Sequence, residues 1–252
     1  MQDLRVTLVQ SDIIWENPTA NREVLTPQLT QLAGQTDLII LPEMFTTGFT
    51  LAGEQLAEVM DNTSEGTTAH WLTKMASVTG AAITGSCIIR DDGKLYNRLL
   101  WATPDGELYH YDKNNLFSFA GEDSVYSGGE ALLTVHLKGW RIRPFICFDL
   151  RFPEWSSRRK GTYDLGIYVA NWPDSRQNHW FSLLLARAIE NQIYVAGVNR
   201  IGRDGNRLCY AGGSVLVDPE GEVLHECGRD QAVTTHQLDG DSLQAYRKRF
   251  PM

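Results

Sequence analysis

Short apolar runs that alternate with amphipathic segments are the feature of this sequence that most constrains its fold. The apolar runs include residues 37–41, 165–170 and 193–198. Strands this apolar are covered on both of their faces. The segments with apolar residues at helical spacing include 17–32, 67–78 and 180–190. The alternation predicts an α/β protein that contains mixed sheets.

Further strands are expected along the whole chain, with a short helix at 154–160. These strands are predicted at 4–9, 81–89, 96–103, 108–111, 132–137 and 141–148, with a hairpin of 214–217 and 222–225. We find no linker, repeat or low-complexity segment, so residues 1–252 are expected to form a single domain. A four-layer αββα sandwich covers such strands on both faces, although the pattern alone does not separate it from a three-layer fold.

Charge and hydropathy restrict the possible partners. The formal net charge is −8, and the longest basic cluster is the triplet at 158–160. Phosphate binding needs clustered Lys and Arg, so no nucleic-acid partner is expected. No stretch reaches the roughly 18 apolar residues of a membrane span, and the N-terminus shows no signal-peptide pattern. We therefore expect a cytoplasmic protein without a membrane contact.

Cysteine usage argues against metal and redox sites. The four cysteines lie at positions 87, 147, 209 and 227 and form no C-x-x-C pair. The histidines form no H-x-x-x-H pattern, and no phosphate-binding glycine motif follows a strand. A zinc site or a redox pair is therefore not expected, and free thiols are predicted in a reducing compartment.

Cys147 follows an apolar strand and precedes an abrupt turn. Residues 143–154 read Arg-Pro-Phe-Ile-Cys-Phe-Asp-Leu-Arg-Phe-Pro-Glu. A side chain at such a point is held rigidly, and neighbouring backbone N–H groups can face a substrate oxygen, as in the nucleophile elbow of serine hydrolases. Taken alone, a cysteine after an apolar run is more often an inert core residue.

Two more reactive side chains follow predicted strands. Glu43 ends the run at 38–43, and Lys113 follows the strand at 108–111. With Cys147 they would suit acyl transfer to sulfur: a carboxylate takes the thiol proton, and an ammonium stabilises the thiolate and the oxyanion. Individually, Glu43 is also a plausible cap of a turn, and Lys113 a plausible surface charge.

Together the three runs resemble the nitrilase superfamily of carbon–nitrogen hydrolases. The family's Pro-Glu corresponds to 42–43, its Lys followed by Leu-Phe to 113–117, and its Cys-Tyr-Asp-x-Arg-Phe-Pro-Glu to 147–154. Further matches extend from 171 to 202. The resemblance implies catalysis by Glu43, Lys113 and Cys147, an αββα sandwich, and no metal or organic cofactor. It also implies a homodimer, with which an aromatic and apolar tail at 246–252 is consistent.

The resemblance also implies a second glutamate that positions the lysine and the base. Glu122 fits it by its spacing to Gly129. Two positions depart from the family pattern, since Asn115 replaces a frequent His and Phe148 replaces the commoner Tyr. Phe148 still offers a backbone N–H to the oxyanion hole. Asn115 leaves open how the segment after Lys113 is supported.

Two further runs, 117–122 and 171–180, resemble the ω-amidase branch of this family. That branch hydrolyses the terminal amide of 2-oxoglutaramate or 2-oxosuccinamate, so the partners implied are a small amide and water. Such a substrate carries a carboxylate beside a ketone, so the pocket needs a cation or amide donors. The candidates for substrate contact are Arg176, Trp172, Phe148 and Phe119.

Each of these side chains has an alternative interpretation. Arg176 is equally consistent with a surface salt bridge. Phe45, Phe119 and Trp172 are candidates for the pocket wall but also for the core. Arg151 and Arg187 are expected to be structural partners of Asp or Glu.

Other functions remain open at this point. Within the same family, an N-carbamoyl amide hydrolase or a nitrilase is the main alternative to an amidase. A catalytically idle module that binds metabolites or proteins is an alternative of another class, although the retention of Glu43, Lys113 and Cys147 argues against it. The scattered cysteines argue against a thiol-based metal or redox protein.

Overall fold

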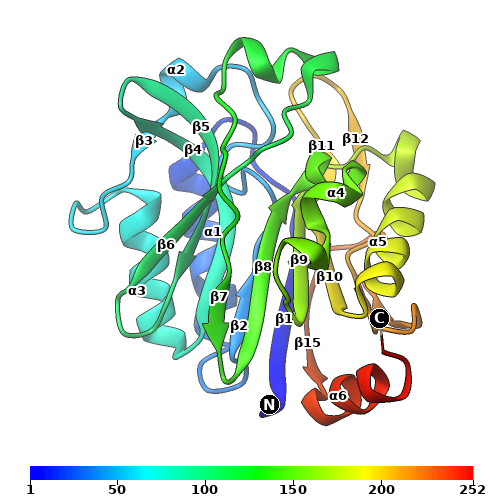
Figure 1. The fold of residues 1–252 in the computed structure, drawn as a ribbon. Coiled ribbons are helices and arrows are strands. Elements are labelled where there is room, and N and C mark those ends of the chain that lie inside the picture. Colours follow the sequence, from blue (N-terminus) through cyan, green and yellow to red (C-terminus); the bar gives the residue numbers. More distant parts are fainter. Residues whose placement is uncertain (252) are drawn as a thin grey trace.

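Two mixed β-sheets packed face to face form the centre of the molecule in this computed structural model (Figure 1). The structure describes residues 1–251, so Met252, the last residue of the tail considered above, lies outside it. In spatial order the first sheet comprises β15 (Ala232–Leu238), β1 (Leu4–Gln10), β2 (Leu38–Ile40), β4 (Ala82–Asp91), β5 (Lys94–Ala102) and β6 (Leu108–Asp112), with β3 (Glu58–Val59) beside β4. The second comprises β14 (Val223–Glu226), β13 (Val215–Val217), β10 (Tyr194–Asn199), β9 (Leu165–Ala170), β8 (Trp140–Ile146) and β7 (Val135–Leu137).

Helices cover the outer faces of both sheets. One hydrophobic core lies between the sheets and contains, for example, Leu8, Leu99 and Ile167. A second core joins the first sheet to α1 (Pro18–Thr30) and α3 (Thr68–Thr79), and a third joins the second sheet to α5 (Gln177–Asn191). The α/β prediction is confirmed, and the four layers decide against the three-layer alternative.

The main helices begin where the sequence supplies caps. The Asn17 side chain accepts the Ala20 N–H at the start of α1, and Thr67 accepts the His70 N–H at the start of α3. Gly80 ends α3 with φ = 70°, a left-handed conformation that suits glycine. None of the helices within residues 1–251 is long and apolar enough to cross a membrane.

Three predicted elements have different bounds in the structure. The expected helix at 154–160 is divided into α4 (Pro153–Ser156) and the 3-10 turn η4 (Arg158–Lys160), because Ser157 is extended. β7 begins only at Val135. β8 ends at Ile146, so Cys147 and Phe148 already belong to the 3-10 turn η3 (Cys147–Arg151).

Several elements were not predicted at all. They are β3, β15, the ribbon of β11 (Ile201–Arg203) and β12 (Cys209–Ala211), the short helix α2 (Gly53–Leu56) and the C-terminal helix α6 (Gly240–Arg249). β15 lies antiparallel to β1, with Leu4 opposite Leu238. Its buried and exposed side chains alternate, but polar residues occupy many of the inward positions, which hides the strand pattern.

Strand directions bring four loops together. β1, β2 and β4 are parallel, as are β8, β9 and β10. β6 has the direction of β4, because each is antiparallel to β5. The segments that follow β2, β6, β8 and β9 therefore emerge at the same end of the sandwich, where the candidate site lies.

Candidate active site

Cys147 occupies a strained turn at the end of β8. Its φ is 44°, a left-handed value that a side chain with a Cβ adopts at a cost of about 1–3 kcal/mol. The side chain is half-buried at the base of a pocket. The thiol is thus held at a sharp change from strand to 3-10 turn, which is the geometry predicted from its sequence context.

Glu43 follows β2 and is completely buried. Its Oε2 accepts the backbone N–H of Asn171 at 2.7 Å, and its Oε1 accepts Asn97 Nδ2 at 2.9 Å. Asn171 Nδ2 also donates to the backbone oxygen of Glu43 at 2.6 Å. The end of β9 therefore fixes both the backbone and the carboxylate of Glu43.

Lys113 follows β6, and its side chain is only 1% exposed. Its Nζ lies 3.0 Å from Glu43 Oε1 and 2.9 Å from Glu122 Oε2. Burial by itself would lower the pKa of Lys113, but the charges of Glu122 and Glu43 outweigh it and raise the pKa above its usual range. The ammonium form is therefore the one that fits this site.

Glu122 lies in the 3-10 turn η2 (Glu122–Ser124) and is completely buried. Both of its carboxylate oxygens accept from Lys113 Nζ, and Oε2 also accepts the Phe117 N–H at 2.6 Å. Glu122 thereby ties the loop after Lys113 to the ammonium itself. The structure brings Glu43, Lys113, Glu122 and Cys147 into one buried cluster.

Electrostatics favour a neutral thiol at rest. Burial raises the pKa of Cys147 well above its usual value, the charge of Glu43 raises it further, and the charge of Lys113 opposes the rise. A carboxylate thus lies beside a protonated thiol. This arrangement suits proton transfer from sulfur to Glu43 at the moment of attack.

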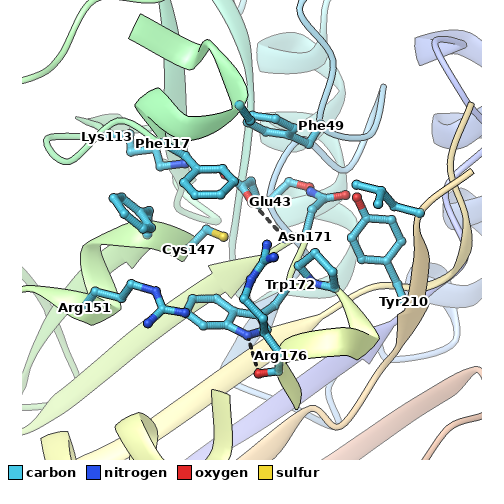
Figure 2. Close-up of a pocket in the computed structure, with 14 residues that line it drawn as sticks. Glu43, Phe49, Lys113, Phe117, Cys147, Arg151, Asn171, Trp172, Arg176 and Tyr210 are labelled. Atoms are coloured by element: carbon cyan, nitrogen blue, oxygen red, sulfur yellow. Dashed lines mark hydrogen bonds and ion pairs between the residues drawn. The ribbon is translucent and has the colours of Figure 1, made fainter. Parts of the chain in front are cut away.

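A pocket opens above these groups, and Figure 2 shows its lining. Its walls are mainly apolar, formed by Phe49, Phe117, Phe148, Trp172, Pro173 and Leu208. The space measures about 510 Å³ when its open mouth is included.

Two arginines line this pocket without a carboxylate partner within residues 1–251. The Arg151 guanidinium lies 4.9 Å from the Trp172 ring and contacts His179 Nδ1 at 3.0 Å. The Arg176 guanidinium lies 5.6 Å from the Phe117 ring. Burial and then the charge of Arg176 lower the pKa of Arg151. An anion in the pocket would relieve this repulsion.

The family assignment follows from comparison with known proteins. The family model described as carbon-nitrogen hydrolase matches residues 5–248. This chain belongs to the carbon–nitrogen hydrolase family. It is 41% identical to omega-amidase YafV of Escherichia coli (strain K12), over 100% of this chain and 96% of that protein. It is 34% identical to 2-oxoglutaramate amidase of Bacillus subtilis (strain 168), over 98% of this chain and 95% of that protein.

Solved structures agree with this assignment. A CN-hydrolase superfamily protein from Xanthomonas campestris, whose active site holds an arsenic adduct, is 46% identical and superposes with a TM-score of 0.95. The match covers 100% of this chain and 96% of that one. Nit3 of Saccharomyces cerevisiae, a nitrilase superfamily member, is 27% identical with a TM-score of 0.89, over 100% of this chain and 95% of Nit3.

Two predictions about the pocket of this carbon–nitrogen hydrolase are wrong. Phe119 does not line the pocket, because the turn η1 (Ser118–Ala120) directs its side chain outward and leaves it 92% exposed. Arg151 has no acidic partner among the described residues and lines the pocket instead. Arg187, in contrast, pairs with Glu190 at 2.9 Å as expected. Of the two interpretations of Phe45, the structure shows the core one.

Sequence reasoning also missed several residues of the pocket. Phe117 and Asn171 stood inside recognised motifs, so their positions carried a signal. Leu208 and Tyr210 come from the β11–β12 ribbon, and no local pattern pointed to them. Arg176 and Trp172 line the pocket as expected, and the salt-bridge interpretation of Arg176 is excluded within residues 1–251.

Proposed function

We propose that this chain is an ω-amidase that hydrolyses the terminal amide of small 2-oxo acids such as 2-oxoglutaramate and 2-oxosuccinamate. The names of the relatives from Escherichia coli and Bacillus subtilis support this activity. The structural observation that carries the proposal is the position of two guanidinium groups above the cluster of Cys147, Glu43 and Lys113. They belong to Arg151 and Arg176, and neither has a carboxylate partner within residues 1–251. A substrate with a carboxylate at one end and an amide at the other fits that arrangement.

In the first half-reaction the substrate acyl group is transferred to sulfur. Glu43 takes the Cys147 proton while Sγ attacks the amide carbon and forms the S–C bond. Glu43 then returns the proton to the amide nitrogen as the C–N bond breaks. Ammonia leaves, and a thioester remains on Cys147.

Water resolves the thioester in the second half-reaction. Glu43 takes one proton from water while the oxygen bonds to the acyl carbon. The C–S bond breaks, and Glu43 gives its proton to Sγ. The dicarboxylate leaves and the thiol is restored.

Both half-reactions pass through an oxyanion. Lys113 Nζ supplies a fixed positive charge, kept in place by Glu43 and Glu122. The backbone N–H of Phe148 supplies a second donor, since it lies in the first turn of η3, where N–H groups lack a partner inside the turn. Glu122 acts on Lys113 and on the loop at Phe117.

We assign the orientation of the substrate to Arg176 and Arg151 at the mouth of the pocket. Arg176 reaches the pocket from the turn η5 (Asp174–Arg176), and Trp172 Nε1 donates to the Arg176 backbone oxygen at 2.8 Å. The Arg151 guanidinium lies 4.9 Å from the same indole ring. A carboxylate held by these guanidinium groups would direct the amide end toward Cys147.

A panel of substrates tests this activity. Ammonia release is measured from 2-oxoglutaramate and 2-oxosuccinamate, and also from N-carbamoyl amino acids and nitriles. Wild-type enzyme should prefer the two oxo-acid amides, and Cys147→Ala should lose several orders of magnitude in kcat. Cys209→Ala, at an exposed thiol, is the matched control. Preference for another class supports the alternative branch, and no turnover at all supports an idle binding module.

We further propose a cytoplasmic homodimer without a nucleic-acid partner. Exposed Ile189 and Phe250 near the end of α5 and α6 offer apolar surface for such pairing. Symmetric pairs are the commonest soluble assemblies. Sedimentation at micromolar concentration should show twice the 28.3 kDa of the chain, and only a monomer would contradict the proposal.

A further inference from the structure

Asp149 is a completely buried carboxylate beside the active-site cluster that the mechanism above does not use. Its Oδ2 accepts the Ile146 N–H at 3.0 Å and the Tyr111 hydroxyl at 2.7 Å. Its Oδ1 accepts both the backbone N–H and the side-chain Nδ2 of Asn115, each at 2.9 Å. Four donors thus converge on two oxygen atoms.

This carboxylate has no Lys, Arg or His partner within the described part of the chain. Burial raises the pKa of Asp149, while the hydrogen bonds from Ile146, Tyr111 and Asn115 oppose the rise. An ionised carboxylate is an acceptor only, and four donors satisfy its oxygens without a counter-ion. Its charge is thus stabilised by hydrogen bonds from two segments, residues 111–115 and the residue before Cys147.

These segments are the ones that carry the reacting groups. Ile146 immediately precedes Cys147, and Asn115 follows Lys113 by two residues. Tyr111 precedes Lys113 by two residues and also accepts Trp155 Nε1 at 2.8 Å. We propose that Asp149 and Asn115 are positioning residues, which together set the distance between the Lys113 ammonium and the Cys147 thiol.

Asn115 is the residue of this pair whose side-chain hydrogen bond can be removed by substitution while Asp149 stays in place. The Asp149 side chain is surrounded by four donors, whereas Asn115 contributes one removable side-chain bond and one backbone bond. Removing the amide leaves one carboxylate lone pair unfilled and loosens the segment around Lys113, which then keeps only the backbone N–H of residue 115 and the Tyr111 hydroxyl as its bonds to Asp149. Misplacement of a catalytic group by about 1 Å can cost on the order of 100-fold in rate.

The same geometry explains how Asn115 fits a position where a histidine is frequent in this family. Asn and His both carry an N–H donor that reaches a neighbouring carboxylate. Position 115 then requires a side chain with an N–H donor to Asp149, and histidine should meet this requirement. Ala, which lacks a donor, should not.

The activity arm of the test rests on the proposed function. Asn115→Ala should lower kcat for 2-oxoglutaramate at least tenfold with less than a threefold change in KM, and Asn115→His should recover kcat to within about threefold of wild type. Asn114→Ala is the matched control, because the neighbouring half-buried Asn114 donates to Gly129 instead. Its kcat should stay within about threefold of wild type.

A second arm needs no amidase turnover. Iodoacetamide alkylation of Cys147 is followed by mass spectrometry, with the exposed Cys209 as internal standard. Lys113 lowers the pKa of Cys147, so displacement of the ammonium should slow Cys147 alkylation severalfold in Asn115→Ala and leave Cys209 unchanged. This result in an enzyme that releases no ammonia would sustain the inference and reject the proposed function.

Three results would overturn the inference in an active enzyme. They are an unchanged kcat in Asn115→Ala, equal losses in Asn114→Ala and Asn115→Ala, or no recovery with histidine. A merely structural role predicts that Asn115→Ala lowers kcat only in step with its melting temperature and leaves Cys147 alkylation unchanged. That pattern would also overturn the inference.

Discussion

Lys113 Nζ and Glu43 Oε1 lie 3.0 Å apart, with side chains that are 1% and 0% exposed (Figure 2). Glu122 contacts the same ammonium at 2.9 Å. One cation thus balances two carboxylates beside the Cys147 thiol. Removing one member of such a cluster leaves buried charge without compensation, so substitutions here affect both stability and catalysis.

Lys113→Arg should be nearly inactive, with kcat lower by about 1,000-fold or more. The substitution keeps the charge, but the guanidinium is planar and larger than the ammonium, and it would occupy the space of the acyl group. Steady-state ammonia release measures the effect. Lys94→Arg, at the exposed first residue of β5, is the control and should behave as wild type. Activity of Lys113→Arg within tenfold of wild type would contradict an oxyanion role.

Glu43→Gln should form the thioester slowly and hydrolyse it more slowly still. Glutamine keeps the size of the side chain but cannot take a proton from Cys147 or from water. Mass spectrometry of the quenched reaction should then detect an acyl adduct on Cys147. Full steady-state activity of the variant would rule out Glu43 as the base.

Arg176→Gln should raise KM for 2-oxoglutaramate at least tenfold. The guanidinium has no acidic partner within residues 1–251 and faces the pocket, so its loss removes a contact to the substrate carboxylate. Hydrolysis of an uncharged amide such as butyramide should change much less. Arg159→Gln, at an exposed position, is the control. An equal rise in KM for both substrates would show that Arg176 supports the shape of the pocket and does not bind the substrate carboxylate.

His236→Gln should weaken the dependence of stability on pH below about pH 7. The His225 and His236 rings lie 4.0 Å apart between β14 and β15, and burial and then the charge of His225 lower the pKa of His236. The unfolded chain, with an ordinary His pKa of about 6.5, therefore takes up a proton at a higher pH than the folded one. The contribution of neutral His236 to the free energy of unfolding is therefore complete above the unfolded-state pKa of about 6.5. It is lost as the pH falls through the lowered pKa of the folded state.

Urea unfolding at several pH values measures this slope. His136→Gln removes an exposed histidine on β7 and should leave the slope unchanged. Identical slopes in wild type and His236→Gln would show that the stacked pair does not couple folding to protonation.

Local sequence patterns were sufficient for much of the architecture. Apolar runs such as 38–40 and 165–170 are strands because they are buried on both faces, and capped amphipathic segments such as α1 and α3 are helices. β15 escaped prediction because it owes its place to pairing with β1, from the opposite end of the chain. Local pattern carries no information about such a partner.

The candidate site shows the same difference between what local pattern predicts and what contacts between remote segments decide. The motifs around Glu43, Lys113 and Cys147 are contiguous, so the sequence alone identified the reactive groups and the family they resemble. Whether Phe117 or Phe119 faces the pocket depends on the turn η1, which contains Phe119. The sequence around Arg151 predicts a structural partner, whereas the structure places Arg151 in the pocket lining. The bonds from Asn115 to Asp149 join residues 34 positions apart. Sequence determined which chemical groups are present, while the tertiary structure decided their distances and partners, because these depend on contacts between segments that are remote along the chain.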